Sequence, residues 1–276
     1  MLIFYGSHSS DWMNVLNSNL SKDLSIQVLN CCDANILQNI NHKYIIPLME
    51  SHTKELLKKN IPTYVGISLE TLNILSNKKL FYEKMLEYDL TNYVPRTWTK
   101  PITNPINKKL IVKPYDMCAG YGQYIVNNSS KLNDKVFDKH IVQEYTHGNK
   151  EYAAQIVFMN EILECVLYEC TYAKTEYIRG ASYLNDHERC KVNNDDFKEH
   201  LQVIAKVLAR FNYLGICCVD FKISENGDTH ILEINPRLGG SLMLPSNKSD
   251  LVQIIKSYCN MVDLVKNRNC LLEPKI

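Results

Sequence analysis

The stretch VDFKISENGDTHILEINPRLGGS, residues 219–241, decides the fold expected for this chain. Two apolar runs, ICCVDFKIS and THILEIN, flank the tetrapeptide ENGD, and an Asn-Gly pair between two such runs is a strong β-hairpin signal. Antiparallel pairing would bring Asp220 on the first strand close to Glu233 on the second. Glu233 and Asn235 are two residues apart, so on an extended strand their side chains point to the same face.

These three oxygen-bearing side chains predict a site for a divalent cation. Oxygen ligands without sulfur or imidazole suit a hard ion, magnesium or manganese. Arg237 follows directly and could hold a phosphate. The alternative is a solvent-facing hairpin whose acidic residues keep a sheet edge soluble. Because Glu233 and Asn235 interrupt an apolar run and precede a Pro-Arg turn and two glycines, the metal and phosphate site is favoured.

A second segment, LIVKPYDMCAGYGQYIV (110–126), places a lysine at the end of an apolar strand. Burial of such a lysine is unfavourable unless it meets an anion. Lys113 is therefore a candidate phosphate ligand, and Gly120 and Gly122 would let the following loop approach phosphate oxygens through its backbone amides. The order of lysine and glycines excludes a Walker P-loop. A lysine that extends to solvent before a flexible hairpin remains an alternative.

A third segment, HIVQEYTHGNKEYAAQI (140–156), reads as two strands joined by a short turn that contains glycine. The backbone groups of such a connector can form hydrogen bonds with the edge of an adenine, while a carboxylate accepts hydrogen bonds from the ribose hydroxyl groups. Glu144 and Glu151 lie at its two ends. An ordinary hairpin with exposed acids is the alternative.

The order of these three segments resembles the ATP-grasp superfamily, and within it the carbamoyl-phosphate-synthase-like and carboxylate–amine ligase branch. The string EINPR (233–237) is the most specific part of the resemblance, which covers roughly residues 75–245. It implies an α/β N-terminal lobe followed by central and C-terminal α+β ATP-grasp lobes that clamp a nucleotide. The lobes expected are residues 1–92, 93–148 and 149–276.

The resemblance also implies roles for individual residues. Asp220, Glu233 and Asn235 match the family's ligands for Mg²⁺ (or Mn²⁺), and Arg237 matches an arginine that binds the transferred phosphoryl group. The implied ATP contacts are Lys113 at the phosphates, with Gly120 and Gly122 in the loop that covers them, Glu144 and Tyr145 at the adenine, Glu151 at the ribose, and Lys78 or Lys79, between which the spacing does not choose.

The activity implied is that of an ATP-dependent carboxylate–amine ligase. One substrate carboxylate would be activated as an acyl phosphate and joined to an amine, with an amino acid or a peptide-like molecule as the substrate class. The alternatives are an ATP-grasp kinase, a ligase with another acceptor, and a nucleotide-binding protein without catalysis. The segment 171–188 is expected at the substrate mouth, where Arg179 either binds a carboxylate or is merely exposed. A homodimer is a family-level expectation.

The remaining sequence alternates strands and helices in the pattern of a small parallel α/β lobe. Residues 2–6, 25–30 and 43–48 read as strands, and residues 50–60 and 68–88 have apolar residues at helical spacing. No GxGxxG follows the first strand. Prolines then punctuate residues 93–105, which reads as a linker or a domain entry. Two further helices are expected, over residues 195–215 and 250–267.

Composition limits the partners. The formal charge of +1 over 276 residues gives no general attraction to nucleic acid or an anionic membrane. No apolar run approaches the ~20 residues that span a bilayer, and the first residues lack the features of a signal peptide. The ten cysteines include two adjacent pairs but no CxxC, which favours reduced structural thiols. The sequence therefore predicts a cytoplasmic protein with small-molecule partners.

Overall fold

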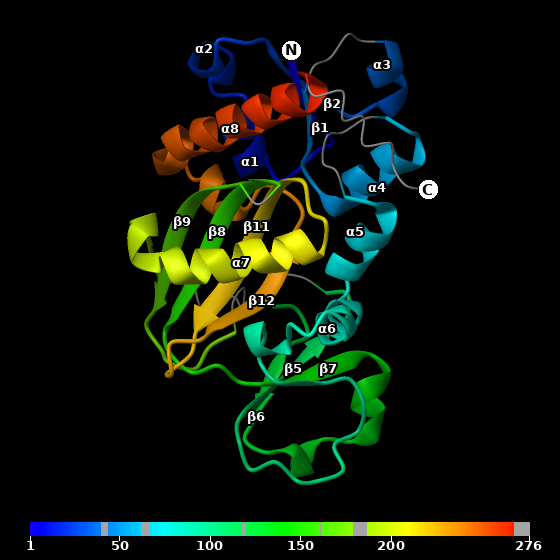
Figure 1. The fold of residues 1–276 in the computed structure, drawn as a ribbon, viewed down its shortest axis with the longest axis vertical. Helices are drawn as coiled ribbons and strands as arrows, with labels where there is room; N and C mark the ends of the chain where they lie inside the picture. Colours follow the sequence, from blue (N-terminus) through cyan, green and yellow to red (C-terminus); the bar gives the residue numbers. More distant parts are fainter. Residues whose placement is uncertain (40–43, 62–66, 118–119, 161, 179–186, 268–276) are drawn as a thin grey trace.

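The computed structural model describes residues 1–39, 44–61, 67–117, 120–160, 162–178 and 187–267. Three sheets follow one another along the long axis of the molecule, as Figure 1 shows. The sheet from the N-terminal residues lies at one end, a five-stranded sheet in the middle and a four-stranded sheet at the other end.

The N-terminal sheet is parallel, with strand order β2-β1-β3, which confirms the α/β lobe predicted from the sequence. Its four-residue central strand β1 is buried throughout, as expected for an apolar run covered on both faces. The strands are β1 (Leu2–Tyr5), β2 (Val28–Cys31) and β3 (Tyr44–Pro47), and the accompanying helices are α1 (Ser10–Leu16), α2 (Leu20–Leu24), α3 (Ala34–Asn39) and α4 (Glu50–Lys58).

The helical pattern over residues 68–88 forms two helices, α5 (Leu69–Leu75) and α6 (Lys78–Glu87). The break has a local cause. The Asn77 side chain accepts hydrogen bonds from the backbone N–H groups of Lys79 and Leu80, which is the standard N-cap arrangement. Helix α6 therefore begins at Lys78, and this start sets the direction of the two neighbouring lysines.

The four-stranded sheet is antiparallel, with order β4-β7-β5-β6, and encloses a small core of its own. Of the two readings of the proline-rich stretch 93–105, the structure favours a domain entry, because Thr97 and Trp98 within it pair with β7. The strands are β4 (Thr97–Trp98), β5 (Leu110–Pro114), β6 (Tyr124–Val126) and β7 (His140–Glu144), with 3₁₀ turns η1 (Thr91–Tyr93), η2 (Ser129–Lys131) and η3 (Asp134–Asp138).

The five-stranded sheet is also antiparallel, with order β10-β9-β8-β11-β12. Helix α7 crosses one face together with α5 and α6, and α8 packs on the other face with the N-terminal sheet. Its strands and helices are β8 (Lys150–Met159), β9 (Ile162–Tyr172), β10 (His187–Lys191), α7 (Lys198–Arg210), β11 (Gly215–Ile223), β12 (Thr229–Asn235) and α8 (Lys248–Asn267), with 3₁₀ turns η5 (Asn194–Phe197), η6 (Gly240–Met243) and η7 (Pro245–Asn247).

Within the described ranges, no helix combines the length and the apolar character needed to cross a membrane.

Candidate functional site

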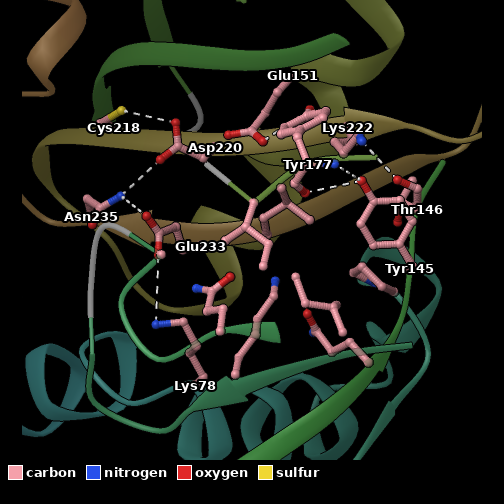
Figure 2. Close-up of a pocket in the computed structure, with 18 of the residues that line it drawn as sticks. Lys78, Tyr145, Thr146, Glu151, Tyr177, Cys218, Asp220, Lys222, Glu233 and Asn235 are labelled. Atoms are coloured by element: carbon pink, nitrogen blue, oxygen red, sulfur yellow. Dashed lines mark hydrogen bonds and ion pairs between the residues drawn. The ribbon is translucent and has the colours of Figure 1, made fainter. Parts of the chain in front are cut away.

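The predicted hairpin of β11 and β12 brings the three oxygen-bearing side chains together. Asp220 lies directly opposite Glu233, and Cys218 opposite Asn235. The Asn235 amide Nδ2 is 3.3 Å from Asp220 Oδ2 and 3.1 Å from Glu233 Oε1. Figure 2 shows this group at one end of a pocket. The amide hydrogens of Asn235 thus lie between two carboxylates, in a position that would suit a cation.

Strand alternation explains why β11 can serve both the core and this site. Cys217, Val219 and Phe221 point into the core beneath α7. Cys218, Asp220 and Lys222, which lie between them in sequence, line the pocket on the opposite face.

A bulge next to Asp220 adds one residue to β12, because the register steps from Glu233 to Ile231. The extra residue, Leu232, also lines the pocket. A bulge of this kind redirects side chains locally.

The pocket has a volume of about 280 Å³ and lies where the four-stranded and five-stranded sheets meet. Polar and charged groups line the end near Asp220, while Ile111, Tyr145 and Leu232 contribute apolar surface. A site with one apolar region and a few converging polar groups is typical of small-molecule binding.

The structure distinguishes the two lysines that the sequence left open. Lys78 lines the pocket, its Nζ lies 4.0 Å from Glu233 Oε2, and it donates a 2.6 Å hydrogen bond to the Met117 carbonyl. Lys79 lies outside the lining and sits over the Tyr115 ring at 5.4 Å.

Lys113, at the end of β5, lines the same pocket and is only 7% exposed. Burial, reinforced by the charge of Lys78, lowers the pKa of Lys113 to about 8, although the Glu233 and Glu151 carboxylates oppose the shift. Gly120 lines the pocket. Gly122 does not; its φ of +68° requires glycine, and a Cβ there would lie 3.0 Å from Pro114 Cγ.

The connector between β7 and β8 (residues 145–149) begins beside the pocket. Glu144 and Tyr145 both line the pocket, and the Glu144 carboxylate forms an ion pair with Lys108. The Tyr145 hydroxyl accepts a 2.9 Å hydrogen bond from the Tyr177 backbone N–H. Glu151, 4% exposed, accepts a 3.5 Å hydrogen bond from the Tyr177 hydroxyl.

Arg237 lines the pocket beside the carboxylates, and its guanidinium lies 6.0 Å from the Trp12 ring of α1. Its Nη1 donates a 3.0 Å hydrogen bond to the Leu238 carbonyl. Arg179 lies outside the described residues, so its predicted place at the substrate mouth stays a prediction.

Sequence reasoning singled out neither Lys222 nor Tyr177, although both line the pocket. Lys222 was detectable, because it lies two residues after Asp220 on the same strand and therefore on the same face. Tyr177 lies in the segment 171–188 expected at the substrate mouth, but no pattern singled out this residue, since it reaches the pocket from the irregular stretch after β9.

A magnesium-type ion fits the donor set. Asp220 and Glu233 supply carboxylate oxygens, and rotation of the Asn235 amide would supply a third oxygen. Among the described residues, no three His, Cys, Asp or Glu side chains gather as a metal-binding group.

Comparison with known proteins agrees with the family resemblance noted in the sequence. Residues 75–241 match the family model described as "ATP-grasp domain". The arginine-specific large chain of carbamoyl phosphate synthase from Bacillus subtilis is 24% identical over 199 residues, covering 66% of this chain and 18% of that protein. A D-alanine–D-alanine ligase from Fusobacterium nucleatum is 27% identical over 151 residues, covering 51% of this chain and 50% of that protein. The matches thus span half or less of these two relatives.

The fold is also similar to that of a solved structure, the L-amino acid ligase from Bacillus licheniformis. The TM-score is 0.68 at 11% sequence identity, and the match covers 94% of this chain and 74% of that chain. At this identity, the similarity shows a shared fold.

Proposed function

We propose that this chain, which belongs to the ATP-grasp family, uses ATP and Mg²⁺ (or Mn²⁺) to activate a substrate carboxylate and join it to an amine. The observation that carries the proposal is the convergence of Asp220, Glu233 and Asn235 with four cationic side chains in one pocket. Carboxylates that bind a metal beside lysine and arginine suit a polyphosphate, which needs both kinds of partner.

The nucleotide would lie along the pocket with its base near the connector and its phosphates near β12. Tyr145 and the backbone beside it would contact the adenine, and Glu151 would accept hydrogen bonds from the ribose hydroxyl groups. Lys113 and Lys78 would contact the phosphates, and the loop at Gly120 would cover them.

Asp220, Glu233 and Asn235 would hold the magnesium ion. When bound, such an ion neutralises charge on the β- and γ-phosphate oxygens. The role of these residues would be to present two carboxylates and one amide oxygen together on paired strands, which is the kind of oxygen ligand that magnesium takes.

The first chemical step is phosphoryl transfer. An oxygen of the substrate carboxylate attacks the γ-phosphorus, the bond to the bridging oxygen breaks, and ADP leaves with the electron pair. Lys113 and Arg237 offset the charge that develops on the transferred group.

In the second step, the amine nitrogen attacks the acyl carbon, phosphate leaves, and the nitrogen loses a proton. Arg237 would stabilise the oxyanion. The pocket must exclude water during both steps, because an acyl phosphate hydrolyses. Amino acids are the proposed substrate class, since the D-alanine–D-alanine ligase and the L-amino acid ligase are named for them.

The test is a screen of amino-acid pairs for ADP release, with hydroxylamine added as a trap and products identified by mass spectrometry. A hydroxamate reports an acyl phosphate, whereas a kinase product does not form one. Glu233→Gln is expected to lower ADP release on the order of 100-fold. Glu225→Gln, in the exposed turn of the same hairpin, is the matched control and should match wild type.

Two outcomes would contradict the proposal. Phosphorylated product without hydroxamate would favour the kinase alternative. Tight binding of ATP without ADP release from any pair would favour a nucleotide-binding protein without catalysis.

A further inference from the structure

Lys222 is a buried lysine in the pocket whose contacts differ from those of Lys78 and Lys113. It lies two residues beyond Asp220 on β11 and is 5% exposed. Its Nζ donates hydrogen bonds of 2.8 Å to the carbonyl oxygens of both Thr146 and Gly148. Both acceptors belong to the connector between β7 and β8, so the side chain bridges β11 to the backbone that joins the two larger sheets.

Two aromatic rings surround the same ammonium group. The Nζ atom lies 4.6 Å from the centre of the Tyr177 ring and 5.4 Å from that of Tyr145. Both distances are within the range of cation–π attraction. Figure 2 shows Lys222, Tyr145, Tyr177 and Thr146 together on the side of the pocket away from Asn235 and Glu233.

The paired strand makes a second contact with the connector. His230 lies opposite Lys222 in the β11–β12 register, and its Nδ1 is 3.1 Å from the Thr146 hydroxyl. The two strands that carry Asp220 and Glu233 therefore also fix the connector, one step further along the same face. This arrangement sets the distance between the carboxylates and the connector through a rigid pair of strands.

The contacts partly offset an otherwise unfavourable burial. A buried lysine destabilises a protein unless its charge is compensated. Here two carbonyl dipoles and two ring faces stabilise the ammonium group, and in return the ammonium group holds the backbone of Thr146 and Gly148 in place. Thr146 and both rings line the pocket, so any movement of the connector would change its shape.

We propose that Lys222 is a positioning residue for the nucleobase: it fixes the connector and the rings of Tyr145 and Tyr177 against which the base binds. The proposal rests on the proposed function, since it assumes that the pocket receives a nucleotide. If this is correct, Lys222 contributes to binding of the base and not to binding of the phosphates.

Isothermal titration calorimetry with two probes tests this distinction. One probe is a non-hydrolysable ATP analogue with Mg²⁺, and the other is Mg²⁺-tripolyphosphate, which has no base. Lys222→Met removes both hydrogen bonds at similar side-chain length. It is expected to weaken binding of the ATP analogue about tenfold or more, because hydrogen bonds from a charged donor are lost. Binding of tripolyphosphate is expected to stay within about twofold of wild type.

Two further variants complete the test. Lys222→Arg retains the charge and the hydrogen-bond donors and is expected to keep analogue affinity within about threefold. Lys150→Met, which removes an exposed lysine at the start of β8, is the control and should bind both probes as wild type does.

Wild-type affinity of Lys222→Met for the ATP analogue would overturn the inference while leaving the proposed function intact. Equal losses for both probes in Lys222→Met or Lys222→Arg would also overturn it, because they would indicate a general structural role. Failure of the wild-type protein to bind the analogue would overturn the proposed function and this inference with it.

Discussion

At the scale of single residues, Lys113 is the clearest case of a side chain that suits ligand binding but lowers the stability of the fold. Burial first, and the charge of Lys78 second, lower the pKa of Lys113 to about 8. Keeping this lysine charged at neutral pH therefore lowers the free energy of unfolding, on the order of 3 kcal/mol. Such a residue is expected where a ligand, and not the fold, supplies the compensating charge.

Lys113→Met should therefore stabilise the protein and weaken its binding of nucleotide. We expect the free energy of unfolding at pH 7 to rise by ~1–3 kcal/mol, with Mg-ATP binding weakened about 100-fold. Denaturant unfolding and calorimetry measure the two effects. Lys79→Met, which removes the lysine outside the pocket lining, should leave affinity unchanged. A destabilised Lys113→Met protein would contradict this view of the lysine.

The same group predicts a pH dependence with a definite sign. In the unfolded chain Lys113 keeps its proton up to about pH 10.5, whereas in the folded protein it loses it above about pH 8. The unfolded state binds more protons between these values, so the contribution of Lys113 raises the free energy of unfolding as pH rises from 8 to 10.5.

Nucleotide affinity should change in the opposite direction, because the neutral amine attracts phosphate weakly. We expect the affinity for Mg-ATP to fall as pH rises above about 8, by up to ~10-fold per unit. The difference between wild type and Lys113→Met, titrated in parallel, isolates this contribution. Parallel profiles for the two proteins would rule it out.

The sequence predicted those site residues whose partners lie along one hairpin. Asp220, Glu233 and Asn235 meet because strand alternation and the turn fix their register. The choice between Lys78 and Lys79 could not be made, since the direction of each side chain depends on where the Asn77 cap starts the helix. Proximity between residues of different sheets is a tertiary property that local pattern does not contain.

At the scale of elements, the turn that follows β12 connects the carboxylates to the core. The Gly239 N–H donates a 2.9 Å hydrogen bond to Gln155 Oε1, and the Gln155 amide donates to Cys218 Sγ at 3.2 Å. The Cys218 thiol in turn lies 3.8 Å from Asp220 Oδ1. The turn can approach β8 and β11 this closely because residue 239 has no side chain.

Gly239→Ala should disrupt this packing. Its Cβ would lie 2.7 Å from Cys218 Sγ and closer still to the Gln155 amide nitrogen. We expect a loss of about 1–3 kcal/mol in the free energy of unfolding, together with weaker Mg²⁺-dependent nucleotide binding, because the residues beneath Asp220 must shift. Thermal melting and calorimetry measure both.

Gly240→Ala is the matched control. The Cβ would meet only Trp12 Cζ2, at an ordinary contact distance of 3.7 Å. Stability within about 0.5 kcal/mol of wild type is expected there. Similar effects of the two substitutions would show that the close approach at residue 239 has no special importance.

The longer helices and strands, which depend on local sequence, were predicted, whereas a strand that depends on distant contacts was not. The long strands and the parallel N-terminal sheet follow from apolar periodicity, and both were predicted. The two-residue strand β4 was not, because pairing with β7 defines it and its own residues carry no periodic signal. The break at Ser76–Asn77 was also missed, since a capping asparagine within a helical pattern is outweighed by the apolar residues around it.

At the scale of the whole molecule, the three sheets are not equally connected. The N-terminal sheet and the five-stranded sheet share one large core with α8 between them. Hydrogen bonds reinforce it, including one of 2.7 Å from the Tyr258 hydroxyl to the Ile45 carbonyl. Among the residues that the structure describes, the four-stranded sheet has a separate and much smaller core, whose buried residues are Leu110, Val112, Phe137 and Val142. The division into lobes at residues 92 and 148 stays a prediction.

This difference predicts where local opening occurs. Amides of β5 and β7 should exchange with solvent about tenfold or more faster than those of β8 and β11, because a small core gives low local stability. Hydrogen exchange with mass spectrometry resolves the two sheets. Mg-ATP is expected to slow exchange in β5 and β7 most, since Lys113 and Tyr145 would couple the smaller sheet to the bound nucleotide.

The Asp220→Asn variant provides the control, because it weakens the metal site on the five-stranded sheet without altering the core of the smaller one. Without nucleotide it should exchange as the wild-type protein does, and Mg-ATP should protect it less. Equal exchange in both sheets of the unliganded protein would contradict the prediction. Protection confined to β8 and β11 would show instead that the four-stranded sheet takes no part in holding the nucleotide.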